Sequence, residues 1–170
     1  VLDVSLAEGV GSIGAALDQF DASLRDLAAS PADRGLRRAV LGSADSVAQA
    51  FRQASQSMLD ARDEADRRVA DEVGQVNRLT SEVDRLQREI RRSEVTGTEA
   101  SDLRDQRDQH VRELAELVPV DVLDGPDGTV TVLLRGSLAL VHAEGGTGQL
   151  SAAVSASDGR MHVFRVSAGR

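Results

Sequence analysis

The residues that could do chemistry in this chain are three histidines, a glycine-rich stretch and a dense run of arginines and carboxylates. His110, His142 and His162 are the candidates for nitrogen metal ligands or for proton transfer near neutral pH. No histidine has another histidine three or four residues away, and the sequence contains no nucleophile elbow and no paired-acid spacing. We therefore interpret the histidines as exposed or packed side chains, and predict no catalytic residue and no metal site.

Glycines at 9, 11 and 14 match the dinucleotide-binding pattern literally, with Asp33 at roughly the right distance beyond them. That site needs a strand before the glycines and a second parallel strand after the helix. The sequence instead continues into Ser30-Pro31 and a long amphipathic stretch. A flexible glycine-rich start to a helix fits better. Residues 145–148 are also glycine-rich, but they lack the Lys-Ser/Thr of a phosphate loop and predict a mobile turn. No cofactor is expected.

The run of charged residues after position 100 is the most concentrated chemical feature. Its members are Asp102, Leu103, Arg104, Asp105, Gln106, Arg107 and Asp108. One interpretation is a solvated helix face with internal ion pairs, such as Asp108 with Arg112. The other is a subunit interface, because bidentate arginine–carboxylate contacts give orientation and specificity to packing.

Composition narrows the class of protein. The chain has 170 residues, no cysteine, no tryptophan or tyrosine and only three phenylalanines, so its core must be aliphatic. It lacks the aromatic anchors that are usual in nucleotide or sugar pockets. The net charge of −8 disfavours nucleic acid as a partner, and no apolar run is long enough to span a bilayer. The first residues, without Met or a basic leader, suggest an excised fragment or a matured chain.

Two helical stretches come first along the chain. Apolar residues spaced by three or four from Ile13 predict a helix that ends near Ser30-Pro31. A second helix is expected from Pro31 to about Arg92, with Ser30 as its N-cap, as one very long helix or two nearly collinear ones. A single helix of this length would span roughly 90 Å. Its apolar stripe runs from Leu36 to Ile90 and keeps a heptad rhythm over residues 76–90.

A third helix is expected to fold back on the second. A turn at residues 93–97 precedes Thr98 and Ser101, either of which could cap a helix that runs to about Val118. Because the turn is short, this helix must lie antiparallel to the end of the long one, so that their apolar stripes bury each other.

The periodicity changes to strands after Pro119. Strands are predicted at 120–123, 129–134, 137–142, 149–156 and 161–166, with tight turns at Pro126-Asp127-Gly128 and Ser157-Asp158-Gly159. The expected fold is mainly α with a β domain: an elongated antiparallel helical bundle with one very long helix (residues 1–118), followed by a small antiparallel β-rich domain (residues 119–170). About fifty residues in short strands leave open edges, so the β domain is expected to be partial.

The sequence resembles one protein family. Residues 101–108, Ser-Asp-Leu-Arg-Asp-Gln-Arg-Asp, are similar to the signature Asn-Asp-Leu-Arg-Asp-Gln-Arg-Asp of the bacterial flagellar hook-associated protein family FlgK. Residues 16–20, 27–31 and 38–41 are similar to the same family in order and spacing. The resemblance covers nearly residues 14–135. Ser101 replaces the usual Asn, and Asp21 stands where the family often has an aromatic residue, so local packing at these positions is expected to differ.

The resemblance implies a structural protein and not an enzyme. It implies a secreted, extracellular component of the hook–filament junction, exported by the flagellar type III system. The partners implied are further copies of the chain, the hook protein and the second junction protein, with no nucleic acid and no membrane. Family members also carry terminal helices that pair in the inner tube, so this chain would be the outer part.

A second class of function stays open on the residues alone. The stripe at residues 76–90 could be an intermolecular zipper, in which case the chain would be a coiled-coil or helical-bundle adaptor that dimerises. If the stripe instead packs on the helix of residues 101–118 in the same chain, Leu86→Asp should mainly lower the melting temperature.

Overall fold

The structure, a computed structural model, describes residues 2–97, 99–125 and 128–166. The chain divides into two compact units, Val1–Ala65 (unit 1) and Asp66–Arg170 (unit 2). Helix α2 (Arg34–Val95) has 62 residues and contributes to both units. The predicted long helix is therefore confirmed as one continuous element, which begins three residues later and ends three residues later than the sequence indicated.

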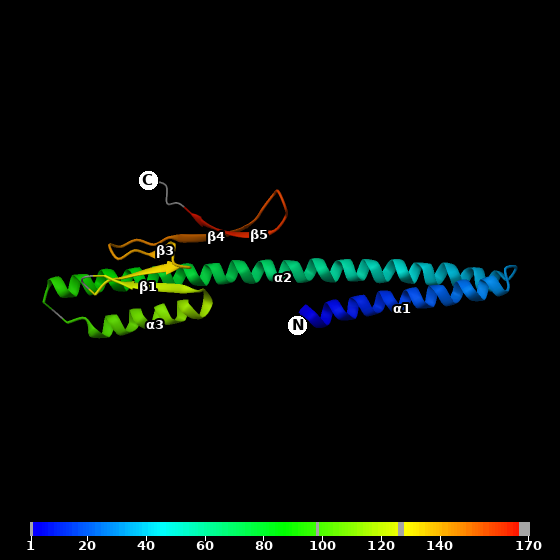
Figure 1. The fold of residues 1–170 in the computed structure, drawn as a ribbon, viewed down its shortest axis with the longest axis horizontal. Helices are drawn as coiled ribbons and strands as arrows, with labels where there is room; N and C mark the ends of the chain where they lie inside the picture. Colours follow the sequence, from blue (N-terminus) through cyan, green and yellow to red (C-terminus); the bar gives the residue numbers. More distant parts are fainter. Residues whose placement is uncertain (1, 98, 126–127, 167–170) are drawn as a thin grey trace. The chain divides into compact units, whose positions relative to one another are not determined.

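Unit 1 is a pair of antiparallel helices. Helix α1 (Leu2–Ala29) runs back along the first part of α2, as the blue and cyan ribbons in Figure 1 show. The predicted flexible start to this helix is wrong, because α1 already includes the glycine-rich positions. The apolar periodicity continues upstream of Ile13 through Leu2, Leu6 and Val10, so the helical signal outweighs the low helix propensity of glycine.

The turn between the first two helices uses a different cap from the one predicted. Ser30 lies at the end of α1, where its N–H donates to the carbonyls of Asp26 and Leu27. The N-cap of α2 is Asp33, whose Oδ1 accepts hydrogen bonds from the N–H groups of Gly35 (2.6 Å) and Leu36 (3.2 Å). The two residues after Ser30 form a turn, so Pro31 is not the first helical residue.

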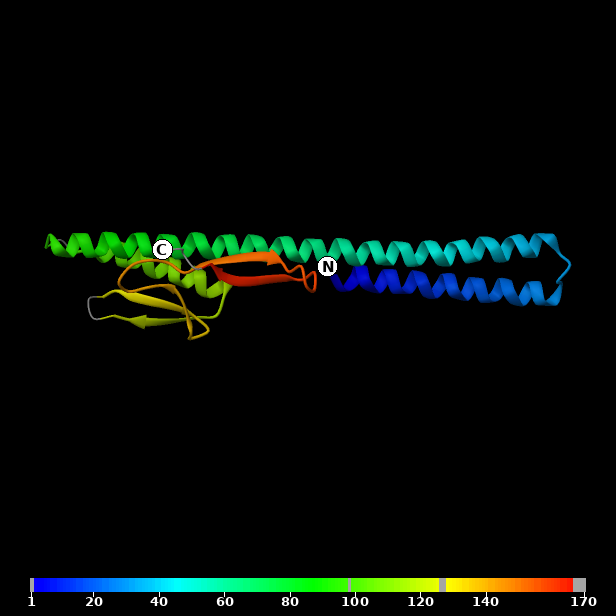
Figure 2. The ribbon, with the colours of Figure 1, turned by 90° about the horizontal axis from the view of Figure 1, so that it is seen from above.

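Unit 2 contains the helical hairpin that the sequence predicted. Helix α3 (Ser101–Leu117) lies antiparallel to the last part of α2 (Figures 1 and 2). Its N-cap is Ala100, which provides no side-chain hydrogen bond; Ser101 is already helical and donates to Glu99. The prediction of Ser101 as a cap is wrong, and Thr98 lies outside the described residues. Gly97, with φ of 77°, permits the left-handed turn that ends α2.

The heptad stripe of α2 is buried inside unit 2. Val83 and Leu86 are 0–1% exposed, and Ile90 is 2% exposed. Val76 and Val83 share a core with Leu114 of α3 and with five strand residues, namely Val130, Val132, Leu140, Val141 and Leu150. An intermolecular zipper along this stripe would need these side chains to leave that core. The hypothesis of dimerisation through the stripe is therefore not supported, and packing within one chain is confirmed.

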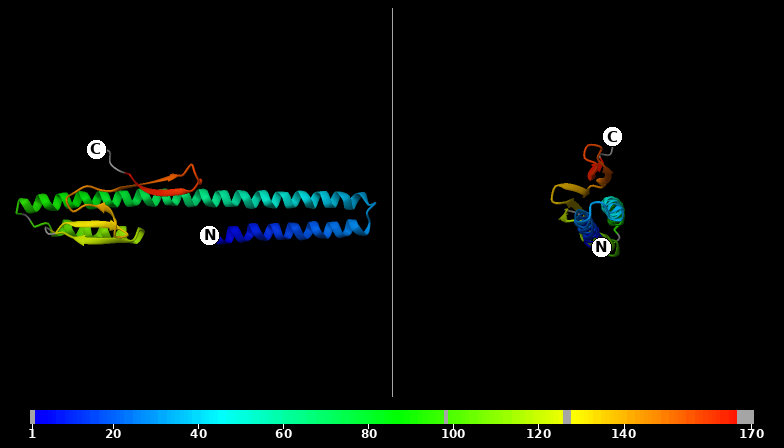
Figure 3. Two further views of the ribbon diagram at one scale, coloured as in Figure 1. Left: turned by 45° about the horizontal axis from the view of Figure 1, so that its top comes forward. Right: turned by 90° about the vertical axis from the view of Figure 1, so that its right-hand side faces the viewer.

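Five strands follow α3. Strands β1 (Val120–Asp124), β2 (Val130–Leu134) and β3 (Leu138–Val141) form an antiparallel sheet in that order, and β4 (Gln149–Val154) pairs with β5 (Met161–Val166) as a separate hairpin (Figure 3). These bounds confirm the predicted strands to within two residues. Positive φ angles at Arg135 and Gly136 give β2–β3 its tight turn.

The β elements do not bury a core of their own. The core residues from β2, β3 and β4 pack on Val76, Val83 and Leu114 of the two helices. The boundary at residues 118 and 119 stays a prediction about domain organisation, since the compact units divide at Ala65 and Asp66.

Candidate functional site

A row of polar side chains on α2 binds the backbone of the β elements. Asn77 makes two bonds to one residue: its Nδ2 donates to the carbonyl of Leu150 (2.7 Å), and its Oδ1 accepts from the N–H of Leu150 (2.9 Å). The amide group thus substitutes for a neighbouring strand at the edge of β4. Because Leu150 is buried, its backbone groups would be costly to leave unpaired.

Three further members of this row bind the start of β2 and the loop between β3 and β4. The Gln87 Oε1 accepts from the N–H of Val130 (2.5 Å), and its Nε2 donates to the carbonyl of His142 (3.4 Å). The Asp84 Oδ1 accepts from the N–H of Gly146 (2.8 Å), and the Arg91 Nη1 donates to the carbonyl of Ala143 (2.6 Å). We call the set the polar row: Asn77, Asp84, Gln87 and Arg91.

The polar row was not predicted from the sequence, although its spacing follows a recognisable pattern. Each member directly follows a residue of the buried stripe: Asn77 follows Val76, Asp84 follows Val83, Gln87 follows Leu86 and Arg91 follows Ile90. Residues one position apart are about 100° apart around a helix, so the polar row repeats at heptad spacing beside the apolar stripe. Through these hydrogen bonds the polar row attaches the β elements to α2.

The charged run at residues 102–108 is divided between two sides of α3. Arg107 is buried and donates from Nη1 to the carbonyl of Gly128 (2.6 Å), while its Nε bonds Asp108 (2.9 Å). Arg104 pairs with Glu94 of α2, and its guanidinium lies against the Gly128 backbone. A side chain at Gly128, whose φ is 65°, would meet that guanidinium.

The side chains of the remaining members of the run are exposed or half-buried. Asp102, Asp105, Gln106 and Asp108 are exposed, and Leu103 is half-buried. The predicted pair of Asp108 with Arg112 is replaced by Asp108 with Arg107 (2.8 Å), and Arg112 instead donates to Gln109. The two arginines thus act inside unit 2, where they contact Gly128 just before β2. A role of the exposed members in a subunit interface stays a prediction.

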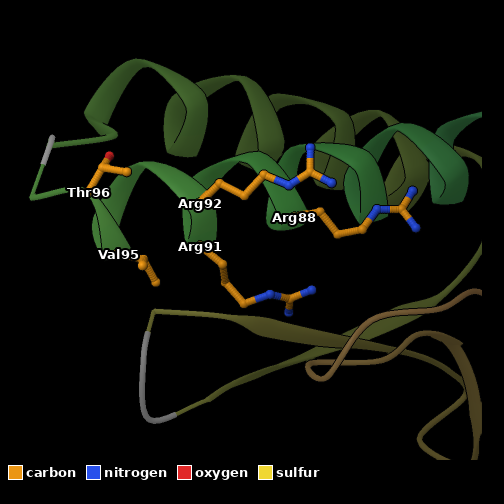
Figure 4. Close-up of a pocket in the computed structure, with 5 residues that line it drawn as sticks. All are labelled: Arg88, Arg91, Arg92, Val95 and Thr96. Carbon is orange, nitrogen blue, oxygen red and sulfur yellow. The ribbon is translucent and has the colours of Figure 1, made fainter.

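Two open hollows flank the end of the α2–α3 hairpin. One has a volume of about 540 Å³ and is lined by Arg88, Arg91, Arg92, Val95 and Thr96 (Figure 4). The second, of about 450 Å³, is lined by Ser93, Glu99, Ala100, Ser101, Asp102, Leu103 and Gln106. We call them the arginine hollow and the acidic hollow. The first offers guanidinium donors and the second offers carboxylate and amide oxygens.

The histidines lie apart from one another. His110 Nδ1 is 3.0 Å from Glu113 Oε2, and this hydrogen bond, with a second from Gln109, lowers the pKa of the Glu113 carboxyl. His162 Nε2 is 3.0 Å from Asp158 Oδ2, in the turn between β4 and β5. The pKa of Asp158 is lowered first by the N–H of Arg160 and then by His162. His142 takes part through its backbone carbonyl.

Neither a metal site nor a membrane span is found in the described part of the chain. No three His, Asp or Glu residues among those described are grouped as a metal ion would require. None of the described helices combines the length and hydropathy needed to cross a bilayer. The dinucleotide pattern has no preceding strand, because residues 9–14 lie inside α1.

The buried hairpin, the charged run on α3 and the attached β strands can be compared with known proteins. The family model described as the flagellar hook-associated protein FlgK helical domain matches residues 1–169. The chain belongs to the FlgK family. It is therefore a component of the bacterial flagellum, and the family likeness that the sequence indicated is confirmed. No curated protein sequence matches the chain.

A solved FlgK structure has the same fold. The flagellar hook junction protein FlgK from Burkholderia pseudomallei superposes with a TM-score of 0.85 at 24% sequence identity, over 96% of this chain. The chain spans 30% of the length of that FlgK chain. At this identity the likeness concerns the fold, and it confirms a mainly α chain with one long helix followed by small antiparallel sheets.

Proposed function

We propose that the chain is a structural part of the hook–filament junction, where copies of it assemble with one another, with the hook protein and with the second junction protein. In this proposal the chain is exported by the flagellar type III route and acts outside the cell. Its role is mechanical and involves no catalysis, no cofactor, no nucleic acid and no membrane.

One observation carries the proposal: the FlgK helical domain matches the chain from residue 1 to residue 169. The match includes both units, so the charged run on α3 and the polar row belong to the matched domain. A family described as flagellar and hook-associated supports a role in the axial structure. The similar Burkholderia pseudomallei protein is a flagellar hook junction protein, which supports the same position for this chain.

The construction of unit 2 suits a part that transmits force. A load-bearing subunit must keep its elements in register, and side chains from α2 and α3 bind backbone groups in the β elements at several separate points. These bonds come from Asn77, Gln87 and Arg91 on α2 and from Arg107 on α3. These bonds are partly or fully buried and therefore costly to break, so they favour a single arrangement over a fluid one.

The surface of unit 1 supports packing against neighbours. Leu17, Leu24, Phe51, Met58 and Leu59 are between 41% and 53% exposed, although two helices already face each other there. Large apolar side chains left open along a helix pair are typical of surfaces that further helices cover. We propose that assembly covers them, and that the exposed members of the charged run contribute contacts at the other unit.

Electron microscopy with antibodies tests the position of the protein. Antibodies raised against residues 1–170 are applied to flagella isolated from the source bacterium. The proposal expects gold label concentrated where the hook meets the filament, and hooks without stable filaments when the coding sequence is deleted. Antibodies depleted on the purified chain provide the control. Label spread along the filament, or normal filaments after deletion, would refute the junction role.

A further inference from the structure

We propose that the arginine hollow of one copy binds the acidic hollow of the next copy, so that Arg88, Arg91 and Arg92 face Glu99 and Asp102 across a head-to-tail contact. The inference rests on the proposed function, since it names surfaces through which copies of the chain would pack. The binding partner of each hollow is a second copy of this chain.

The arginine hollow combines positive charge with an uncovered apolar side chain. Figure 4 shows the three arginines extending in the same direction along one side of α2, with Val95 and Thr96 at the helix end. Val95 is 88% exposed. Arginine is enriched in protein interfaces relative to the rest of the surface, and the cores of interfaces are more apolar than their rims. A purely solvated helix face would not need an apolar side chain in this position.

Only some of the guanidinium N–H donors in this hollow form hydrogen bonds or ion pairs within the chain. Arg91 is held in place by its bond to the Ala143 carbonyl, and one nitrogen of Arg88 pairs with Asp84 at 3.0 Å. The side chain of Arg92 has no hydrogen bond or ion pair with any described residue. Each guanidinium carries five N–H donors, so most of them remain open to carboxylates. The fixed position of Arg91 also lowers the entropy lost on binding.

The acidic hollow offers the complementary groups. Glu99 and Asp102 are exposed, and Gln106 adds an amide oxygen one helical turn further along α3. Glu99 accepts a bond from the Ser101 hydroxyl (3.0 Å), which orients its carboxylate. Asp102 lies in the first turn of α3, where the helix dipole favours a negative charge.

The two hollows of one copy cannot bind each other. Arg88 is two residues from Leu86, and Val95 is five from Ile90, spacings that turn these two residues away from the buried stripe, while Arg91 lies beside it. The acidic hollow lies on the α2–α3 turn and the outer side of α3. A contact between unlike surfaces repeats from copy to copy and gives rings or helical arrays, which is the geometry that an axial structure needs.

Thiol cross-linking tests the contact without removing any of its charges. The chain has no cysteine, so Thr96→Cys in the arginine hollow and Ser101→Cys in the acidic hollow each introduce a single thiol. Because an arginine–carboxylate pair separates the two backbones by more than the roughly 4.4–6.8 Å that a disulfide spans, a short bismaleimide is used. Equal amounts of the two variants are mixed, and heterodimer is measured against time. The matched control replaces Ser101→Cys by Glu116→Cys, on the exposed surface near the other end of α3.

The inference expects several-fold faster heterodimer formation in the 96–101 mixture than in the 96–116 mixture. The advantage should disappear near 1 M salt, where the screening length is about 3 Å. Adding Arg92→Glu to the Thr96→Cys chain should abolish it, and adding Asp102→Arg to the Ser101→Cys chain should restore it. Equal rates in both mixtures, or no restoration by the second charge reversal, would overturn the contact.

This outcome is separate from that of the proposed function. If antibody label lies at the junction and the cross-linking rates are equal, only the contact fails. If the contact forms and the label lies elsewhere, the junction role fails and the contact stands as a property of the chain.

Discussion

Units 1 and 2 use similar amphipathic helices and reach different degrees of burial. In unit 2, large side chains such as Leu86, Ile90, Leu114 and Leu140 are fully buried. In residues 12–65 of unit 1, the buried side chains are small: Ser23, Ser43, Ala50 and Ala54. A β layer covers the helix pair of unit 2, whereas unit 1 consists of two helices alone.

The two units differ in how they are expected to gain their stability. Unit 2 has its own core and its own network of backbone bonds, so we expect it to be the more stable of the two. Unit 1 has large apolar side chains that are about half exposed, and we propose that a neighbouring subunit covers them. A subunit built this way keeps one part folded on its own while a second part gains stability from packing, which is suited to assembly at a defined place.

A charge placed in the core of unit 2 should have the largest effect. Leu86→Asp is expected to destabilise unit 2 by more than about 4 kcal/mol, because it leaves a cavity and buries an unpaired carboxylate. Leu41→Asp is the matched control on the same helix, since Leu41 is 67% exposed, and it should change stability by less than about 0.5 kcal/mol. Thermal unfolding followed by circular dichroism measures both. Similar losses from the two variants would contradict the assignment of the core to unit 2.

Removing one member of the polar row should have an intermediate effect. Asn77→Leu leaves the N–H and carbonyl of Leu150 without their partners, and should destabilise unit 2 by about 1–3 kcal/mol. Ser81→Ala, a neighbouring exposed position, serves as the control. Hydrogen exchange at the Leu150 amide should accelerate in Asn77→Leu alone. An unchanged exchange rate would mean that the amide pair does not hold β4.

The buried serines of unit 1 should contribute less. Ser23 Oγ and Ser43 Oγ are 2.7 Å apart, and each also lies within hydrogen-bonding distance of a carbonyl three residues earlier in its own helix. The two hydroxyl protons can make only two of these three bonds at the same time. Either serine changed to alanine should cost about 1 kcal/mol or less, and the double variant should resemble the single ones. Urea unfolding of the four chains gives the coupling energy. Fully additive losses would show that the hydroxyls do not act as a pair.

Acidification should act most weakly, at the turn between β4 and β5. The pKa of Asp158 is lowered in the folded chain, so its ionised form contributes stability that is present above the ordinary carboxyl pKa and is lost as pH falls through the folded value. A carbon-13 NMR titration of Asp158 should give a midpoint below that of a free aspartate. Asp158→Asn should remove the acid dependence of exchange at the Arg160 amide. A midpoint at the ordinary value would refute the N–H contact as its cause.

Local signals predicted much of the fold from sequence. Periodicity placed α2, α3 and the strands close to their observed bounds, although β1 and β5 are largely exposed. The turn predicted at Ser157-Asp158-Gly159 lies between β4 and β5, and the one predicted at Pro126-Asp127-Gly128 falls mostly outside the described residues. The caps were harder to predict. Ser30, Asp33 and Ser101 are all favourable N-cap residues, and propensity alone could not rank Asp33 above Ser30. The start of α1 was missed because glycine was given more weight than the continuing helical pattern.

The contacts of the charged run could not be predicted from its neighbours in the sequence. The buried Arg107 donates a hydrogen bond to the carbonyl of Gly128, 21 residues away, and Asn77 pairs with a residue 73 positions away. A sequence shows which side chains can donate, and the fold determines which backbone group they reach. The resemblance to FlgK drew attention to the run, but its division into inner arginines and outer carboxylates required the structure.

Hydrogen exchange of the free chain and of assembled flagella tests the central claim most directly. In the free chain, amides of α2 at residues 77–90 should be strongly protected, and those of α1 at residues 12–29 should exchange much faster. On assembly, protection should rise in α1 and change little in the core of unit 2. Equal protection of both helices in the free chain, or no gain in α1 on assembly, would contradict the view that neighbouring subunits complete unit 1.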